Sequence, residues 1–124
     1  MTNRNKDAGS KYEADVVAYL RNHGHPYAAR TLAGSREDRG DISGVHLFDM
    51  PVALQCKRER KLNLSGNLDE TVEQAHNLGT SWFFLIQKRW GRSDIGESYT
   101  VTNLATLAEM LRVQGQLLRS TYER

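Results

Sequence analysis

The sequence has little of what stabilises secreted or membrane-embedded folds. It contains one cysteine, Cys56, two prolines, and no apolar run near the roughly 18 residues that span a bilayer. A lone cysteine excludes an intramolecular disulfide and fits a reducing compartment, so we expect a cytoplasmic protein. The segment after Met1 is polar, and we therefore expect no secretory signal there.

An excess of charge of one sign is also lacking. The 17 basic and 15 acidic residues leave a formal net charge of +2, so bulk charge does not indicate nucleic-acid binding. Two local basic clusters stand out, at residues 57–61 and 88–92. Each cluster is either a solvated loop end or a surface that contacts phosphates, and the sequence leaves both interpretations open.

What is present suits one domain over residues 1–124, with flexible segments expected at 1–8 and 115–124. Hydrophobic periodicity predicts an α/β fold in the order α-β-β-β-α-β-β-α, with helices covering a mixed sheet. The predicted helices cover 10–23, 68–78 and the chain from 104 onward, and the predicted strands cover 26–31, 41–48, 52–57, 81–87 and 98–102. Apolar stripes predict helix faces at Leu68, Val72, Ala75 and Leu78, and at Leu104, Leu107, Ala108 and Leu111.

Glu13 has two interpretations. Ser10 and Glu13 match the capping box at a helix start, in which the serine and the glutamate each bond a backbone amide of the other residue. Glu13 also leads into Val17 and Leu20 at helical spacing, so it lies at the edge of the core-facing stripe. It is therefore either a capping partner or an acid directed toward a site.

Two apolar runs flank a break at residues 49–51 and predict a β-hairpin. If the chain folds back near residue 49, Asp41 lies opposite Lys57. Gln55 and Lys57 are two residues apart and project from one face of their strand, whereas Cys56 projects from the other. An acid, an amide oxygen and an ammonium would then converge at one end of the hairpin.

This combination suits a divalent metal beside a phosphate. Mg²⁺, or Mn²⁺ in its place, prefers oxygen ligands and keeps several waters. The Asp41 carboxylate, the Gln55 amide oxygen and the Cys56 backbone carbonyl are suitable ligands, and Glu13 would complete the shell directly or through water. Lys57 would lie beside the phosphate, where it orients the attacking water or stabilises developing negative charge.

Further residues are candidates for accessory or phosphate-binding roles around this site. A helical amide, Gln74, either reaches this site as an accessory group or is an ordinary helix-surface residue. The basic residues expected to contact phosphates are Lys11, Arg36, Arg58, Arg60, Lys61, Lys88 and Arg89.

Five short motifs together resemble a known protein family. They are Gly9-Ser10-Lys11-Tyr12-Glu13, Arg30, Ser35, Gly40-Asp41-Ile42 and Gln55-Cys56-Lys57. In order and spacing they resemble the PD-(D/E)XK nuclease superfamily, and within it the archaeal-type Holliday junction resolvases and their phage relatives. The resemblance covers residues 9–102. It implies a restriction-endonuclease-like α-β-β-β-α-β core and a homodimer that cuts two strands of branched DNA with one or two Mg²⁺ ions.

Carried over onto this chain, the resemblance makes Glu13, Asp41 and Gln55 the metal shell and Lys57 the catalytic lysine. It also makes Arg30 and Ser35 residues that contact the DNA backbone or support catalysis.

The chain departs from the commonest pattern at two positions. Gln55 replaces an acid, which removes a full negative charge from the metal shell, although Mrr-like restriction nucleases also carry Gln here. Gly40 stands where a proline is usual. Two other functions therefore stay open: a restriction-like or nicking nuclease on duplex DNA, and a non-catalytic DNA-binding module with a weakened metal site.

Overall fold

The computed structural model describes residues 4–32 and 37–123. The elements are α1 (Arg4–Asn22), β1 (Ala29–Arg30), β2 (Ile42–Ser43), β3 (His46–Leu47), β4 (Met50–Pro51), β5 (Ala53–Lys57), α2 (Leu64–Leu78), β6 (Phe83–Gln87), the 3-10 turn η1 (Ile95–Glu97), β7 (Tyr99–Val101) and α3 (Leu104–Tyr122). The predicted order and the α/β class are confirmed, with the predicted second strand divided between β2 and β3.

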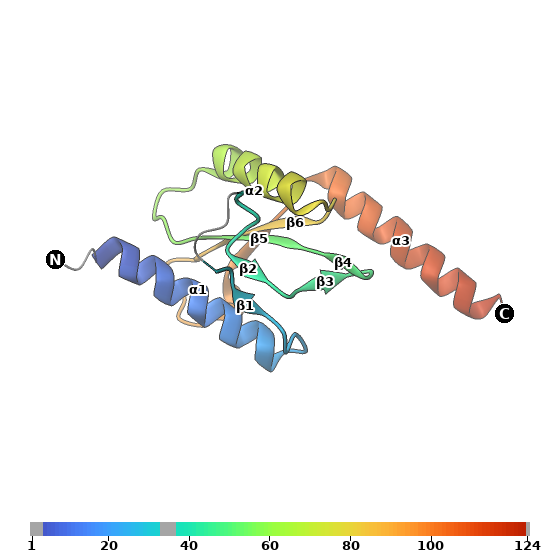
Figure 1. Cartoon of the computed structure of the whole chain (residues 1–124), viewed down its shortest axis with the longest axis horizontal. Helices are drawn as coiled ribbons and strands as arrows, with labels where there is room; N and C mark the ends of the chain where they lie inside the picture. The colour runs from blue at the N-terminus through green and yellow to red at the C-terminus, as the bar shows by residue number, and fades with distance from the viewer. Residues whose placement is uncertain (1–3, 33–36, 124) are drawn as a thin grey trace.

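A five-stranded mixed sheet organises the molecule, in the order β1-β2-β5-β6-β7. Strands β5 and β6 are parallel, and the other neighbouring pairs are antiparallel. Helix α1 covers one face of the sheet and α2 covers the other (Figure 1). Strands β3 and β4 form a separate hairpin beside the sheet.

The central strand β5 divides its side chains between the two faces. Leu54 and Cys56 belong to the main hydrophobic core, which α1 closes with Tyr12. Ala53 belongs to a smaller cluster on the α2 side, which includes Ala75. Because side chains alternate along a strand, Gln55 and Lys57 project toward α2, on the opposite face from Cys56 as predicted.

The predicted pairing of Asp41 with Lys57 is wrong. The chain reverses at Phe48 and Asp49, which both have positive φ (50° and 63°), and this turn moves the pairing of β3 with β4 by one residue from the predicted register. Gly44, at φ +80°, lies between β2 and β3 and interrupts the regular pairing along this side of the hairpin. Ile42 consequently pairs with Leu54, and Asp41 bonds the backbone of Leu54 and Cys56 rather than lying opposite Lys57.

Two helix starts differ from the prediction. Helix α1 begins at Arg4, so Ser10 lies inside the helix and the predicted capping box is absent. Helix α2 begins at Leu64 with Asn63 as its N-cap, and it ends at Gly79 as predicted, where φ is +78°. Part of each segment expected to be flexible is helical, since α1 includes residues 4–8 and α3 continues to Tyr122.

The face that α2 turns toward the sheet is more polar than predicted. Val72, expected to point inward, is 42% exposed. The residues that α2 buries are Asn67, Thr71, Gln74 and Ala75. Buried polar groups require hydrogen-bond partners: Gln74 bonds Gln55 on β5, Asn67 bonds Glu59 after β5, and Thr71 bonds the carbonyl of Asn67 in its own helix.

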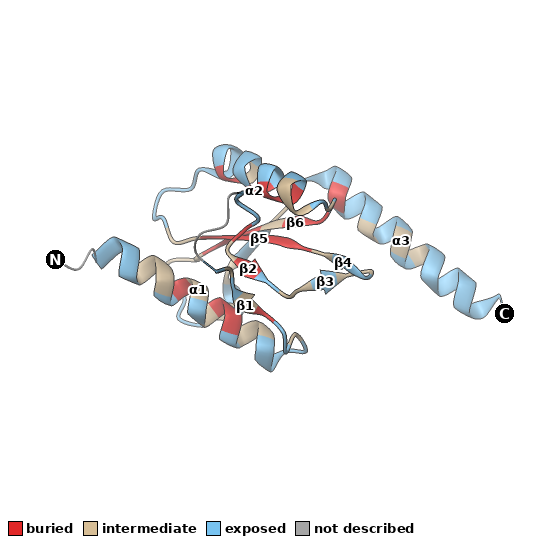
Figure 2. Cartoon of the chain, in the orientation of Figure 1, coloured by how far each residue is buried: buried red, intermediate tan, exposed pale blue. Residues whose placement is uncertain are grey.

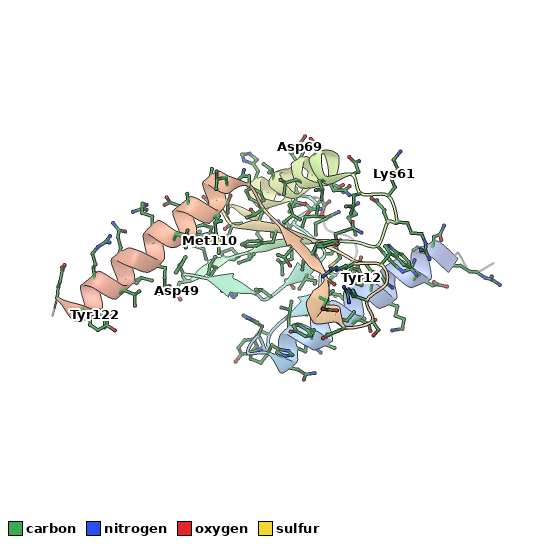
Figure 3. The ribbon with its side chains drawn as sticks, turned by 180° about the vertical axis from the view of Figure 1, so that it is seen from behind. Tyr12, Asp49, Lys61, Asp69, Met110 and Tyr122 are labelled. Carbon is green, nitrogen blue, oxygen red and sulfur yellow. The ribbon has the colours of Figure 1, made fainter. Side chains whose placement is uncertain are left out.

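Helix α3 leaves its apolar stripe uncovered. Leu104, Leu107 and Leu111 are 79%, 44% and 64% exposed, whereas Met110 and Val113 pack against the main core. The C-terminal half of the helix projects beyond the sheet, as its pale-blue surface in Figure 2 and the position of Tyr122 in Figure 3 show. Within the described residues, no helix has the length and apolarity needed to cross a bilayer.

Candidate active site

Two buried glutamines meet between β5 and α2. Gln55 is 4% exposed and Gln74 is 1% exposed. The Nε2 of Gln74 donates hydrogen bonds to the Oε1 of Gln55 and, at 2.8 Å, to the Oδ2 of Asp38. The Oε1 of Gln74 is buried and has no hydrogen-bond partner among the described residues. The structure therefore brings Gln74 to the predicted site and leaves an acceptor there for a further group.

The hairpin positions Asp41 at the start of β2. Its Oδ2 accepts a hydrogen bond from the backbone N–H of Cys56 at 2.8 Å, and its own N–H donates to the carbonyl of Leu54 at 2.7 Å. The preceding residue, Gly40, has φ +101°, and a Cβ there would lie 2.9 Å from the Leu54 carbonyl oxygen. A proline has neither this φ nor this space, which accounts for the glycine at that motif position.

Burial dominates the acidity of Asp41. The pKa of its carboxyl is raised to about 6, chiefly by desolvation and also by the nearby charges of Glu13 and Asp38. The hydrogen bond from Cys56 and the charge of Lys57 lower it. A bound cation would stabilise the ionised carboxylate and so offset the cost of burying it.

Glu70 on α2 contacts both polar side chains of β5. Its Oε2 lies 3.4 Å from the Nζ of Lys57, and its Oε1 accepts a hydrogen bond of 3.2 Å from the Nε2 of Gln55. Sequence reasoning missed both Glu70 and Asp38. The signal for Glu70 was its position four residues before Gln74, which places both side chains on one face of a helix.

Glu13 approaches the site from α1, on the other side of the sheet. Its half-buried carboxylate is held by Arg30, with Nη2 to Oε2 at 3.0 Å and Nε to Oε2 at 3.1 Å. It is close enough to raise the pKa of Asp41, but it makes no hydrogen bond to Asp41, Gln55 or Lys57 in the described part of the chain. Its role as a metal ligand stays a prediction.

The oxygen donors of the site suit a hard cation. In residues 4–32 and 37–123, no three His, Cys, Asp or Glu side chains cluster closely enough to hold a metal ion by themselves. The Asp41 carboxylate, the amide oxygen of Gln55, and backbone carbonyls are hard ligands of the kind Mg²⁺ takes, with waters filling the rest. The free Oε1 of Gln74 and the raised pKa of Asp41 fit this chemistry.

The predicted DNA-contacting residues fall into three groups. Arg58, Arg60 and Lys88 surround Trp90, and Arg89 lies over Tyr99 at 5.3 Å. Lys11 pairs with Asp15, Arg30 pairs with Glu13, and Lys61 is exposed on the loop before α2, labelled in Figure 3. Ser35 and Arg36 lie outside the described residues.

No family model and no curated protein matches this sequence. The chain is similar to a solved structure, that of Hjc from Archaeoglobus fulgidus, a Holliday junction resolvase from an archaeal hyperthermophile. The two are 16% identical, with a TM-score of 0.51, over 77% of this chain and 88% of the Hjc chain. This likeness shows the fold, and it confirms the restriction-endonuclease-like architecture that the sequence motifs predict.

Proposed function

We propose that this chain is a metal-dependent, structure-selective DNA endonuclease that cuts four-way junctions. One observation carries the proposal: the Asp41 carboxylate is bonded to the backbone N–H of Cys56, the residue between Gln55 and Lys57, and these two share one face of β5. The fold supports it, because a Holliday junction resolvase has the same architecture. The basic residues near Trp90 support it as well, since phosphate contacts supply much of the affinity of proteins for DNA.

The chain's own residues have distinct roles in this proposal. Asp41, Gln55 and the Cys56 carbonyl would hold Mg²⁺ or Mn²⁺, with Glu13 completing the shell directly or through water. When bound, the metal polarises the phosphate and supplies hydroxide at neutral pH. Lys57 would donate hydrogen bonds to the phosphate or to the attacking water, and so stabilise the charge that develops.

The α2 side chains keep these groups in place. Gln74 donates to the Oε1 of Gln55 and Glu70 accepts from its Nε2, so both ends of the Gln55 amide are fixed. Glu70 also holds the ammonium of Lys57 at 3.4 Å, which keeps the lysine at the site before the phosphate arrives. Such contacts pre-organise a site, and they reduce the reorganisation needed when substrate binds.

We also propose that the active form is a homodimer, because symmetric cutting of two strands requires two active sites. Leu104, Leu111 and Leu118 recur every seven residues along α3, and all three are exposed. Leu107 lies on the same face, 44% exposed. This spacing is typical of a helix that packs against another helix, and a second copy of the chain supplies one.

Leu111→Glu is expected to convert the dimer into a monomer, because it places a charge at the centre of this seam. Light scattering coupled to size-exclusion chromatography measures the mass directly. Gln116→Glu adds the same charge outside the seam, and that variant should remain dimeric. A wild-type chain that is monomeric at all concentrations, or a Leu111→Glu chain that stays dimeric, would contradict the assignment of this surface.

The substrate is tested by incubating the protein with four-way junction, duplex, flap and single-stranded DNA side by side in Mg²⁺. We expect cutting confined to the junction. Cutting of ordinary duplex would instead favour a restriction-like or nicking nuclease. Binding of DNA without cutting, in Mg²⁺ and in Mn²⁺, would favour the non-catalytic module that the neutral Gln55 keeps open.

A further inference from the structure

Three cations converge on one indole ring beside the candidate active site. The guanidinium carbons of Arg60 and Arg58 lie 3.9 and 4.6 Å from the ring centroid of Trp90, and the Nζ of Lys88 lies 4.4 Å from it. The segments that carry them follow β5 and β6, which are parallel and therefore end at the same edge of the sheet. The N–H of Lys88 donates to the carbonyl of Lys57 at 2.8 Å, which ties the two segments together.

Trp90 is fixed against the segment that carries the two arginines. Its Nε1 donates to the carbonyls of Arg58 and Glu59 at 3.1 and 3.2 Å. Gln87 adds a hydrogen bond of 2.8 Å from its Nε2 to the same Glu59 carbonyl. The backbone that carries Arg58 and Arg60 is therefore held over the ring, and the positions of the two guanidinium groups depend on Trp90.

The charge of this cluster is uncompensated. Within residues 4–32 and 37–123, neither arginine nor Lys88 forms an ion pair with a carboxylate, whereas Lys57 has Glu70 as a partner. Each cation–ring contact contributes about 0.5–1 kcal/mol at an exposed position, which offsets part of the mutual repulsion. Three gathered cations without an acid form a site that favours an anion.

Two cavities connect the cluster with Lys57. The first has a volume of about 560 Å³, and Lys57, Arg58, Arg60 and Trp90 line it. The second, of about 320 Å³, is lined by Arg58 and Lys88 together with Lys11, Arg89 and Arg92. Arg58 borders both cavities, so basic side chains line them from the proposed catalytic lysine to Arg92. Glu59 in the first cavity, and Asp15 and Asp94 in the second, are the acids among the lining residues.

We propose that Trp90 is a positioning residue that assembles Arg58, Arg60 and Lys88 into a binding site for backbone phosphates of the cleaved strand, next to the reacting phosphate. The proposal rests on the proposed function, because the ligand is the DNA strand that enters the same active site. The ring holds three cations and its N–H is bonded to backbone carbonyls, so it orients the cations rather than stacking on a base. The strand then follows the two cavities away from Lys57.

The test measures the affinity for a synthetic four-way junction in EDTA, so that nothing is cut, across a series of salt concentrations. Each phosphate contact contributes about 0.9 to the slope of log affinity against log salt. Trp90→Ala is expected to reduce the magnitude of this negative slope by about 2 and to weaken binding at least tenfold, although the substitution removes no charge. Trp90→Phe, which keeps an aromatic face, should restore at least half of the lost slope.

Two further variants keep the test decisive. Arg60→Ala changes an exposed side chain and should lower the slope by about 1 even if Trp90→Ala does not fold. Arg112→Ala removes an exposed cation on α3, far from the cluster in sequence, and should leave the slope unchanged. A folded Trp90→Ala protein with the wild-type slope overturns the role of Trp90, and an unchanged slope in Arg60→Ala overturns the phosphate site.

The outcome is separable from that of the proposed function. If the variants show these slope changes but the wild-type protein cuts no DNA, the proposed nuclease activity is refuted and the phosphate site is not. A wild-type protein that cuts junctions while all cluster variants keep its slope refutes only the phosphate site.

Discussion

Lys57→Ala is expected to abolish junction cleavage while junction binding stays within about threefold of the wild type. Lys57 lies at the end of β5, on the face it shares with Gln55, where its ammonium would stabilise charge on the reacting phosphate. Removing one such group from a pre-organised site typically costs about 10²–10³-fold in rate. Binding should change little, because in the proposed function many other cations would contact the DNA backbone.

Single-turnover cleavage at saturating protein measures the chemical step of this variant, and a gel-shift titration in EDTA measures its binding. Arg119→Ala, which also removes one positive charge but lies on α3, should cut at the wild-type rate. A Lys57→Ala protein that cuts as fast as the wild type would show that the catalytic assignment is wrong. Equal losses of binding and cutting would show that Lys57 only binds DNA.

Asp41→Asn is expected to abolish cleavage and, unusually for a buried site, to raise the melting temperature at pH 8. The cause is the buried carboxyl, whose pKa is raised to about 6 mainly by desolvation. Ionised Asp41 destabilises the folded protein, and asparagine removes the charge without changing the shape of the side chain. Its amide oxygen can still accept the hydrogen bond from the backbone N–H of Cys56.

The sign of the pH dependence follows from the two protonation states. A free Asp carboxyl titrates near pH 3.9, so between about pH 4 and pH 6 the folded protein binds more protons than the unfolded chain. The contribution of Asp41 to stability therefore falls as pH rises through this window, and the cost is fully present above pH 6. The advantage of Asp41→Asn should approach about 2 kcal/mol at pH 8, with allowance for partial solvent contact, and should vanish below pH 4.

Thermal unfolding of both proteins at pH 3.5, 5 and 8 checks this window, and single-turnover cleavage at pH 8 checks the catalytic role. Ser43→Ala, at an exposed position two residues along the hairpin, is a suitable control. Equal melting temperatures at pH 8 would show that Asp41 is not a destabilised anion. Cleavage by Asp41→Asn at the wild-type rate would remove it from the proposed metal site.

The strand face of the site was predictable, and the register was not. A two-residue spacing on a strand suffices to place Gln55 and Lys57 on one face. The turn at Phe48 and Asp49 lacks the Asn-Gly or Gly-Gly pair that marks a tight hairpin. A phenylalanine also rarely adopts positive φ, so the sequence does not predict a turn at this position. The effect of Gly44 on the pairing depends on the whole hairpin, so its identity alone does not predict the register.

Apolar periodicity predicts which residues share a face of a helix, but it does not predict what packs against that face. The pattern identified the apolar stripe of α3 correctly, but it says nothing about what covers that stripe. On α2 the predicted apolar stripe packs inward at Leu68, Ala75 and Leu78, whereas Val72 is exposed. The signal for a site on α2 was the spacing of Glu70 and Gln74, which are four residues apart and both bond Gln55.

The central claim is that these residues hydrolyse a phosphodiester with a bound divalent metal. Strand-by-strand mapping of nicks in a labelled four-way junction, with Mg²⁺ and with EDTA, tests it most directly. We expect paired nicks on two opposite strands in Mg²⁺ and none in EDTA. Nicks that persist in EDTA, or a protein that binds the junction tightly and cuts no strand in Mg²⁺ or Mn²⁺, would contradict it.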